Sequence, residues 1–213
     1  MKYSRLIGAL FLSAFFFYGI GLALVVSVVG AREFLTTISA HQTTLLAGAF
    51  LMFLNSIVVV SLGVLFFPVV ENHGRRTALA YLAARIAEGV LLAVGVLCIL
   101  MTVPLGQHAT EDWAKGVAAL LVQSNTMAYQ LAVISLGLGS IVLCRLLFRT
   151  RLIPRWLAAW GLIGYAIFMS GGIVEIFGLH IGVWLSIPGG LFEVAVGLWL
   201  LIRGFRSEAI ANG

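Results

Sequence analysis

Apolar residues occur in six long runs along the chain, separated by short stretches that hold most of the charged residues. A helix rises 1.5 Å per residue, so about 20 apolar residues cross a hydrocarbon layer of roughly 30 Å. Each run reaches or closely approaches that length. The pattern therefore predicts an all-α fold, an integral membrane bundle of six transmembrane helices in a single domain over residues 1–213. The expected spans are 6–29, 44–67, 78–102, 116–148, 157–177 and 185–202.

Composition agrees with this interpretation and excludes the main alternatives. Hydrophobic residues make up 62% of the 213 residues and charged residues only 10%, against about 25% charged residues in a soluble domain. So few charges exclude a soluble enzyme, a disordered protein and a disulfide-rich scaffold. Cys98 and Cys144 are expected in opposite leaflets, and we therefore expect both thiols to be free.

The basic residues predict how the bundle is oriented. With the six expected spans, ten of the 13 Lys and Arg residues fall on one side of the membrane and only Arg32 and Lys115 on the other, while Arg85 lies within a span. Lys and Arg concentrate in cytoplasmic loops. The bias therefore predicts that both termini are cytoplasmic. The ten residues are Lys2, Arg5, Arg75, Arg76, Arg145, Arg149, Arg151, Arg155, Arg203 and Arg206.

Known catalytic motifs are missing from the sequence. We find no nucleophile elbow, phosphate-binding loop, dinucleotide fingerprint or zinc-protease helix. The loops are also too short to hold a soluble catalytic domain. We therefore expect no cofactor, and a non-enzymatic role is favoured over an enzymatic one.

Ionisable residues inside spans are costly and mark function by default. Arg85 and Glu88 are three residues apart and share a helix face, with Tyr81 one turn before Arg85. Glu193 lies near the middle of the sixth span. At 1.5 Å per residue, the polar residues of four spans lie ~12–21 Å deep. The sequence therefore predicts one buried cluster in which Arg85, Glu88 and Glu193 are the charges and Asn55 and Gln130 are hydrogen-bonding partners.

Two interpretations of this cluster stay open. In the first, one Arg between two Glu residues is a structural ion network that fixes helix register. In the second, it is a binding site for a small ligand, a cation or a proton. Two carboxylates and one guanidinium leave a spare negative charge, and desolvation opposes the charge of Glu193. Glu193 would then be the titrating group, held in place by Arg85 and Glu88.

Two further groups of residues lie outside the spans. His41, His108 and His180 come from three expected outer segments and could bind zinc together with a carboxylate, but three solvated loop histidines are the favoured interpretation, so no metal is predicted. On the inner side, four arginines lie beside Trp156 and Trp160, a pattern typical of contact with anionic lipid headgroups and not of nucleic-acid binding. These four are Arg145, Arg149, Arg151 and Arg155.

Several short motifs resemble one known family. They are Phe67–Val70, Asn72–Gly74, Arg85–Glu88, Arg149–Leu157, Pro188–Glu193, Gly197–Leu200 and Arg203–Phe205. Together they resemble the bacterial six-span membrane family catalogued as domain of unknown function 4386, over nearly the whole chain. The resemblance implies six helices in one domain, a prokaryotic cytoplasmic membrane, and a family pattern that includes Arg85, Glu88 and Glu193. It implies no activity. Asn55 stands where some relatives are expected to carry an acidic residue, which implies a weaker proton relay through that position.

Three functional hypotheses result from these observations. The first is a membrane protein with a buried polar site for a small ligand, cation or proton, acting in transport or sensing. The second is a non-catalytic accessory or scaffold protein that packs against lipid, a membrane protein partner or a second copy of itself, with a purely structural ion cluster. The third, an intramembrane enzyme acting on lipid, ranks lowest.

Overall fold

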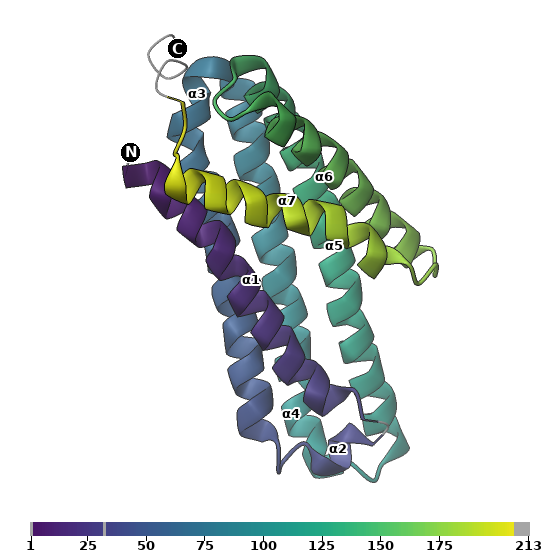
Figure 1. Cartoon of the computed structure of the whole chain (residues 1–213). Helices are drawn as coiled ribbons and strands as arrows, with labels where there is room; N and C mark the ends of the chain where they lie inside the picture. The colour runs from purple at the N-terminus through teal and green to yellow at the C-terminus, as the bar shows by residue number, and fades with distance from the viewer. Residues whose placement is uncertain (1, 32, 207–213) are drawn as a thin grey trace.

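The computed structural model describes residues 2–31 and 33–206, and this part of the chain contains helices and no strands (Figure 1). The long helices are α1 (Lys2–Val29), α3 (Gln42–Leu100), α5 (Asp112–Thr150), α6 (Arg155–Ile176) and α7 (Gly182–Ile202). Two single-turn helices, α2 (Phe34–Thr37) and α4 (Thr102–Leu105), and a 3₁₀ turn at Gly106–His108 lie in the connections. Arg32, which was counted on the outer side, lies outside the described residues.

Five of these helices are long and apolar enough to cross a membrane. The predicted second and third spans both belong to α3, which runs through residues 68–77, where the sequence predicted a loop. Pro68 is inside the helix and exposed. The helical conformation is interrupted at Gly74, where φ is 176° and ψ is 83°.

The two halves of α3 pack against each other as a hairpin about this break. A Cβ atom added at Gly63 would lie 2.8 Å from the Cβ of Arg85, and one added at Gly89 would lie 2.9 Å from the carbonyl oxygen of Ser56. Gly63 and Arg85 are equally far from Gly74 along the chain. The halves are therefore antiparallel, and glycine allows their backbones to approach closely.

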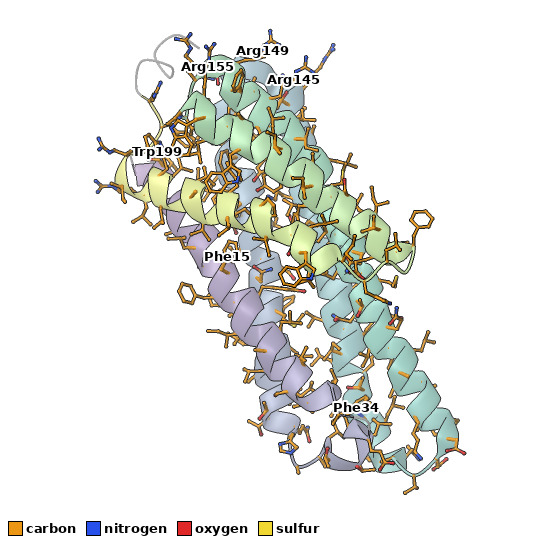
Figure 2. The ribbon with its side chains drawn as sticks, turned by 45° about the vertical axis from the view of Figure 1, so that its right-hand side comes forward. Phe15, Phe34, Arg145, Arg149, Arg155 and Trp199 are labelled. Atoms are coloured by element: carbon orange, nitrogen blue, oxygen red, sulfur yellow. The ribbon has the colours of Figure 1, made fainter. Side chains whose placement is uncertain are left out.

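The five long helices form a closed ring. α1 packs against α3 and α7, α5 packs against α3 and α6, and α6 packs against α7. The ring is uneven, because α6 and α7 are shorter than α5 and than each half of α3. In Figures 1 and 2, α7 is inclined at a large angle to α3 and α5. Its connection to α6 lies partway along α5.

One end of the bundle, called here the basic end, collects four chain segments. A single core cluster joins the start of α1, both sides of the break in α3, the α5–α6 connection and the end of α7. Its members at these places are Ile7, Val70, Ala78, Leu152 and Leu200. Exposed arginines cover this end, and three of them, Arg145, Arg149 and Arg155, are labelled in Figure 2.

The opposite end, called here the far end, has its own core cluster. It joins the end of α1, α2, both ends of α3 and the start of α5, through Val28, Leu35, Leu45, Ile99 and Ala118. No residue of α6 or α7 belongs to it. The chain therefore alternates direction between two ends, with the α6–α7 hairpin joined to the basic half only. Cys98 and Cys144 are both free.

Candidate functional site

Arg85 is the centre of a buried polar cluster in the second half of α3. Its Nε donates a hydrogen bond to the hydroxyl of Tyr81, 2.8 Å away, and its Nη1 donates to Oε2 of Glu88 at 2.9 Å. Tyr81 precedes Arg85 by one turn and Glu88 follows by one turn, so the helix itself aligns all three. The side chains of Arg85 and Glu88 are only 2% and 7% exposed.

Glu193 joins this cluster from α7. Its Oε1 lies 3.8 Å from Nη2 of Arg85 and accepts a hydrogen bond of 2.8 Å from the hydroxyl of Tyr165 on α6. The structure thus brings together the three charges expected to meet. It also adds Tyr165, which was not predicted from the sequence. The one signal in the sequence was a hydroxyl-bearing residue near the middle of an apolar span.

A cavity of about 210 Å³ reaches these charges. Arg85, Glu88, Glu193 and Asn55 line it together with side chains from α1, α5, α6 and α7. Two buried polar atoms of these lining residues, Nη2 of Arg85 and Oδ1 of Asn55, have no hydrogen-bond partner among the described residues, although Nη2 lies 3.8 Å from the Glu193 carboxylate. Unpaired buried polar atoms are costly. The residues around the cavity therefore hold one donor and one acceptor whose hydrogen bonds are not made within the described part of the chain.

Aromatic rings make up much of the remaining wall. Tyr18 of α1 stacks on Tyr129 of α5, with ring centroids 5.3 Å apart and an interplanar angle of 17°. The guanidinium carbon of Arg85 lies 5.7 Å from the centre of the Phe11 ring and 5.2 Å from that of Tyr81. Tyr18, Tyr129 and Phe11 were not predicted, because aromatic residues in a span are equally typical of lipid-facing positions.

The charges of the cluster do not balance. Glu88 pairs closely with Arg85, which leaves the carboxylate of Glu193 as the spare acidic group, 16% exposed beside the cavity. A carboxylate next to aromatic faces can hold a cation, since the face of an aromatic ring attracts positive charge. A proton can also neutralise it.

Gln130 is not on the cavity wall. It is buried, and a Cβ atom added at Gly172 of α6 would lie 3.1 Å from its carbonyl oxygen. Gln130 therefore lies on the side of α5 that packs against α6. Gln130 was predicted to join the cluster from its depth in the membrane alone. Depth does not specify the direction in which a side chain points around the helix axis.

The three outer histidines do not converge. His41 precedes α3 and His108 lies near α4, both at the far end, whereas His180 lies in the α6–α7 connection. No group of three His, Cys, Asp or Glu side chains among the described residues could hold a metal ion. The premise of converging outer loops is wrong, because the α6–α7 hairpin is too short to reach the far end.

Two of these histidines instead pair with nearby glutamates. Nδ1 of His108 lies 2.9 Å from Oε1 of Glu111, and Nδ1 of His180 lies 3.4 Å from Oε2 of Glu175. Hydrogen bonds from His108 and from the indole of Trp113 hold the pKa of the exposed Glu111 carboxyl below its usual value. Glu175 also accepts a hydrogen bond of 2.7 Å from the backbone N–H of Gly182, at the start of α7. These contacts fix local turns.

The four inner arginines are exposed at the basic end. Arg151 ends α5 in the left-handed conformation, with φ at 58°. The guanidinium of Arg155 lies 5.4 Å from the centre of the Phe148 ring. Arg75 and Arg76 lie at the same end, because Gly74 packs against Leu146 of α5.

Comparison with known proteins gives one result. A family model described as "Domain of unknown function (DUF4386)" matches residues 6–204. No curated protein and no solved structure matches the chain.

Proposed function

We propose a function for this chain, which belongs to the DUF4386 family, from its buried polar cavity. It is a multi-pass membrane protein that binds a small ligand, cation or proton at Arg85, Glu88 and Glu193, in transport or sensing. The observation that carries this proposal is the cavity of about 210 Å³, which is lined by all three charged residues and by Asn55. An ion network with a purely structural role would be more stable if protein atoms filled this space.

The chemistry of the wall favours a ligand with a cationic end. Glu193 supplies the spare acidic group and Asn55 an unpaired acceptor, while Tyr18 and Tyr129 supply aromatic surfaces. The volume exceeds that of a cavity of ~150 Å³ that holds a benzene molecule. A single ring with an ammonium group therefore matches the site in size and charge.

We also propose six crossings with both termini on the cytoplasmic face of a bacterial membrane. The hairpin at Gly74 divides α3 into two lengths that can each cross a bilayer, and α1, both halves of α3 and α5 run between the basic and far ends. α6 and α7 are each long and apolar enough to cross as well. The exposed arginines collect at the basic end, as expected for a cytoplasmic face. There, Arg145, Arg149, Arg151 and Arg155 would contact anionic lipid headgroups.

A thermal-stability measurement with three one-ring probes tests the proposed function. Benzylammonium, benzyl alcohol and benzoate share a ring and differ in the charge of their polar end. We expect benzylammonium to raise the Tm of the purified protein and benzoate to leave it unchanged. The Glu193→Gln variant should lose the response to benzylammonium. Glu33→Gln, the same change at an exposed residue, is the matched control and should keep it.

Two outcomes would favour other hypotheses. If Glu193→Gln responds to benzylammonium as the unmodified protein does, the acidic group does not bind the cation. If Glu193→Gln fails to assemble while Glu33→Gln folds normally, the cluster is structural and the accessory or scaffold role is favoured.

A further inference from the structure

The contact between α1 and α7 is tight at one point and loosens along both helices. At the tight point, a Cβ atom added at Gly8 would lie 2.5 Å from the carbonyl oxygen of Gly197 and 2.7 Å from the backbone nitrogen of Leu201. Only glycine permits this approach, so the two helices cross here. The crossing lies at the basic end, beside the start of α1 and the end of α7 (Figure 1).

Farther along α1 the two helices separate. A Cβ atom added at Gly190 of α7 would have as its nearest neighbours only Cε1 and Cζ of Phe15, at 3.7 and 3.9 Å. One turn later on α1, a Cβ atom at Gly19 would have no atom within 4 Å. The contact between α1 and α7 thus becomes looser along α1. The two backbones touch at Gly8, only the Phe15 ring lies near Gly190, and the space beside Gly19 is open. Phe15 lies between α1 and α7 in Figure 2.

This opening belongs to the polar cavity. Phe15, Gly19, Ser186 and Gly190 all line the same cavity as Arg85 and Glu193. Phe15 is 40% exposed, whereas the side chain of Arg85 at the back of the cavity is 2% exposed. The cavity therefore has a mouth between α1 and α7, with Phe15 across it, and a charged interior.

The surface around the mouth is apolar, as a surface in contact with lipid has to be. The neighbouring exposed side chains are apolar on both helices: Phe16 and Ile20 on α1, Ile187 and Leu191 on α7. Phe15 lies about 14 Å along α1 from residue 6, where the apolar span begins, at 1.5 Å per residue, which places the mouth near the middle of a hydrocarbon layer of roughly 30 Å.

We propose that the site is filled sideways from the lipid phase, through a portal between α1 and α7 that the Phe15 ring closes. Its ligands are then membrane-soluble amphipathic molecules, with an apolar body and one cationic end. The cationic end passes Phe15 first and meets Glu193 and Asn55, while the apolar body remains against the aromatic wall. Gly190 has no side chain, so the Phe15 ring can swing aside without a clash. The ligand class rests on the proposed function, whereas the portal itself does not.

The binding kinetics of a membrane-soluble probe test the portal. We choose 4-butylbenzylammonium and the protein reconstituted in phosphatidylcholine vesicles. Because a gate changes the barrier to entry and exit, Phe15→Ala should speed association and dissociation several-fold. Phe16→Ala is the matched control: the same residue type, 66% exposed on the same helix but absent from the cavity wall, and it should bind as the unmodified protein does. Equal rates for the two variants would overturn the portal.

A second measurement needs no ligand and separates the two proposals. A nitroxide is attached at Phe15→Cys in a chain with Cys98→Ala and Cys144→Ala, and its collisions with oxygen and with a water-soluble nickel chelate are compared. Greater access for oxygen is expected, and greater access for the nickel chelate would overturn entry from lipid. If the probe does not bind saturably to the unmodified protein, the proposed function fails, and the nitroxide still decides whether the mouth faces lipid. If the probe binds and Glu193→Gln lowers its affinity, but Phe15→Ala changes neither the association nor the dissociation rate, the proposed function stands and the portal fails.

Discussion

Two acid–base pairs with the same sequence spacing lie in contrasting regions of the molecule. Arg85 and Glu88 are three residues apart on α3, and so are Asp112 and Lys115 on α5. The first pair is separated by 2.9 Å, with side chains 2% and 7% exposed. The second is separated by 3.6 Å, with Lys115 50% and Asp112 99% exposed.

Burial, and not spacing in the sequence, makes such a pair important for stability. Water screens the Asp112–Lys115 pair, and exposed ion pairs contribute little to stability. Around Arg85, the protein has to replace water with two acceptors, the Tyr81 hydroxyl and the Glu88 carboxylate, and with the nearby charge of Glu193. Removing one partner of a buried pair leaves an uncompensated charge, which is far more costly. The same helix geometry thus produces a surface feature in one place and a candidate site in the other.

Breaking the buried pair should have the largest effect. Glu88→Ala removes the closest acidic partner of Arg85 and leaves the guanidinium with the Tyr81 hydroxyl and the more distant Glu193. We expect the free energy of unfolding to fall by about 3–5 kcal/mol, measured by titration with SDS in mixed micelles. Glu33→Ala, at an exposed residue, should change it little. A loss for Glu88→Ala no greater than for Glu33→Ala would mean that water reaches Arg85 freely.

Removing the hydroxyl that holds Glu193 should have an intermediate effect. Tyr165→Phe deletes one hydrogen bond to the carboxylate, and hydrogen bonds to charged groups contribute about 1.5–3 kcal/mol. We expect a smaller loss of stability than for Glu88→Ala, together with weaker binding of benzylammonium, because the carboxylate loses its orientation. Tyr3→Phe, at a residue 65% exposed, is the control. Unchanged benzylammonium affinity would show that Tyr165 does not position Glu193.

Breaking the exposed pair should have the smallest effect. Asp112→Asn removes the partner of Lys115 and one acidic group in the first turn of α5. Both contributions are weak at an exposed site, so the same SDS titration should register a change of less than about 1 kcal/mol. A loss as large as that of Glu88→Ala would remove the contrast between the two pairs.

The site residues differ, for physical reasons, in how far the sequence alone predicts their contacts. Tyr81, Arg85 and Glu88 are aligned by one helix, so their spacing alone predicts their contacts. Glu193 was placed by depth, and the crossing of α7 brings it to Arg85. Depth in the membrane led to a wrong prediction for Gln130, because this residue lies on the side of α5 that packs against α6. Tyr165 was missed, because only the packing of α6 against α7 brings its hydroxyl to Glu193.

The amino-acid sequence alone specifies the class of protein and its local elements. Long apolar runs with few charges specify helices suited to lipid, and the resemblance to the DUF4386 family is borne out over residues 6–204. Only the tertiary structure decided how these helices meet. It replaced the predicted loop at 68–77 by a helix broken at Gly74, it separated His180 from the other outer histidines, and it left a cavity beside Glu193. Hydrophobicity acts on each segment separately, whereas the meeting of residues distant in the chain depends on helix rotation, crossing and length together.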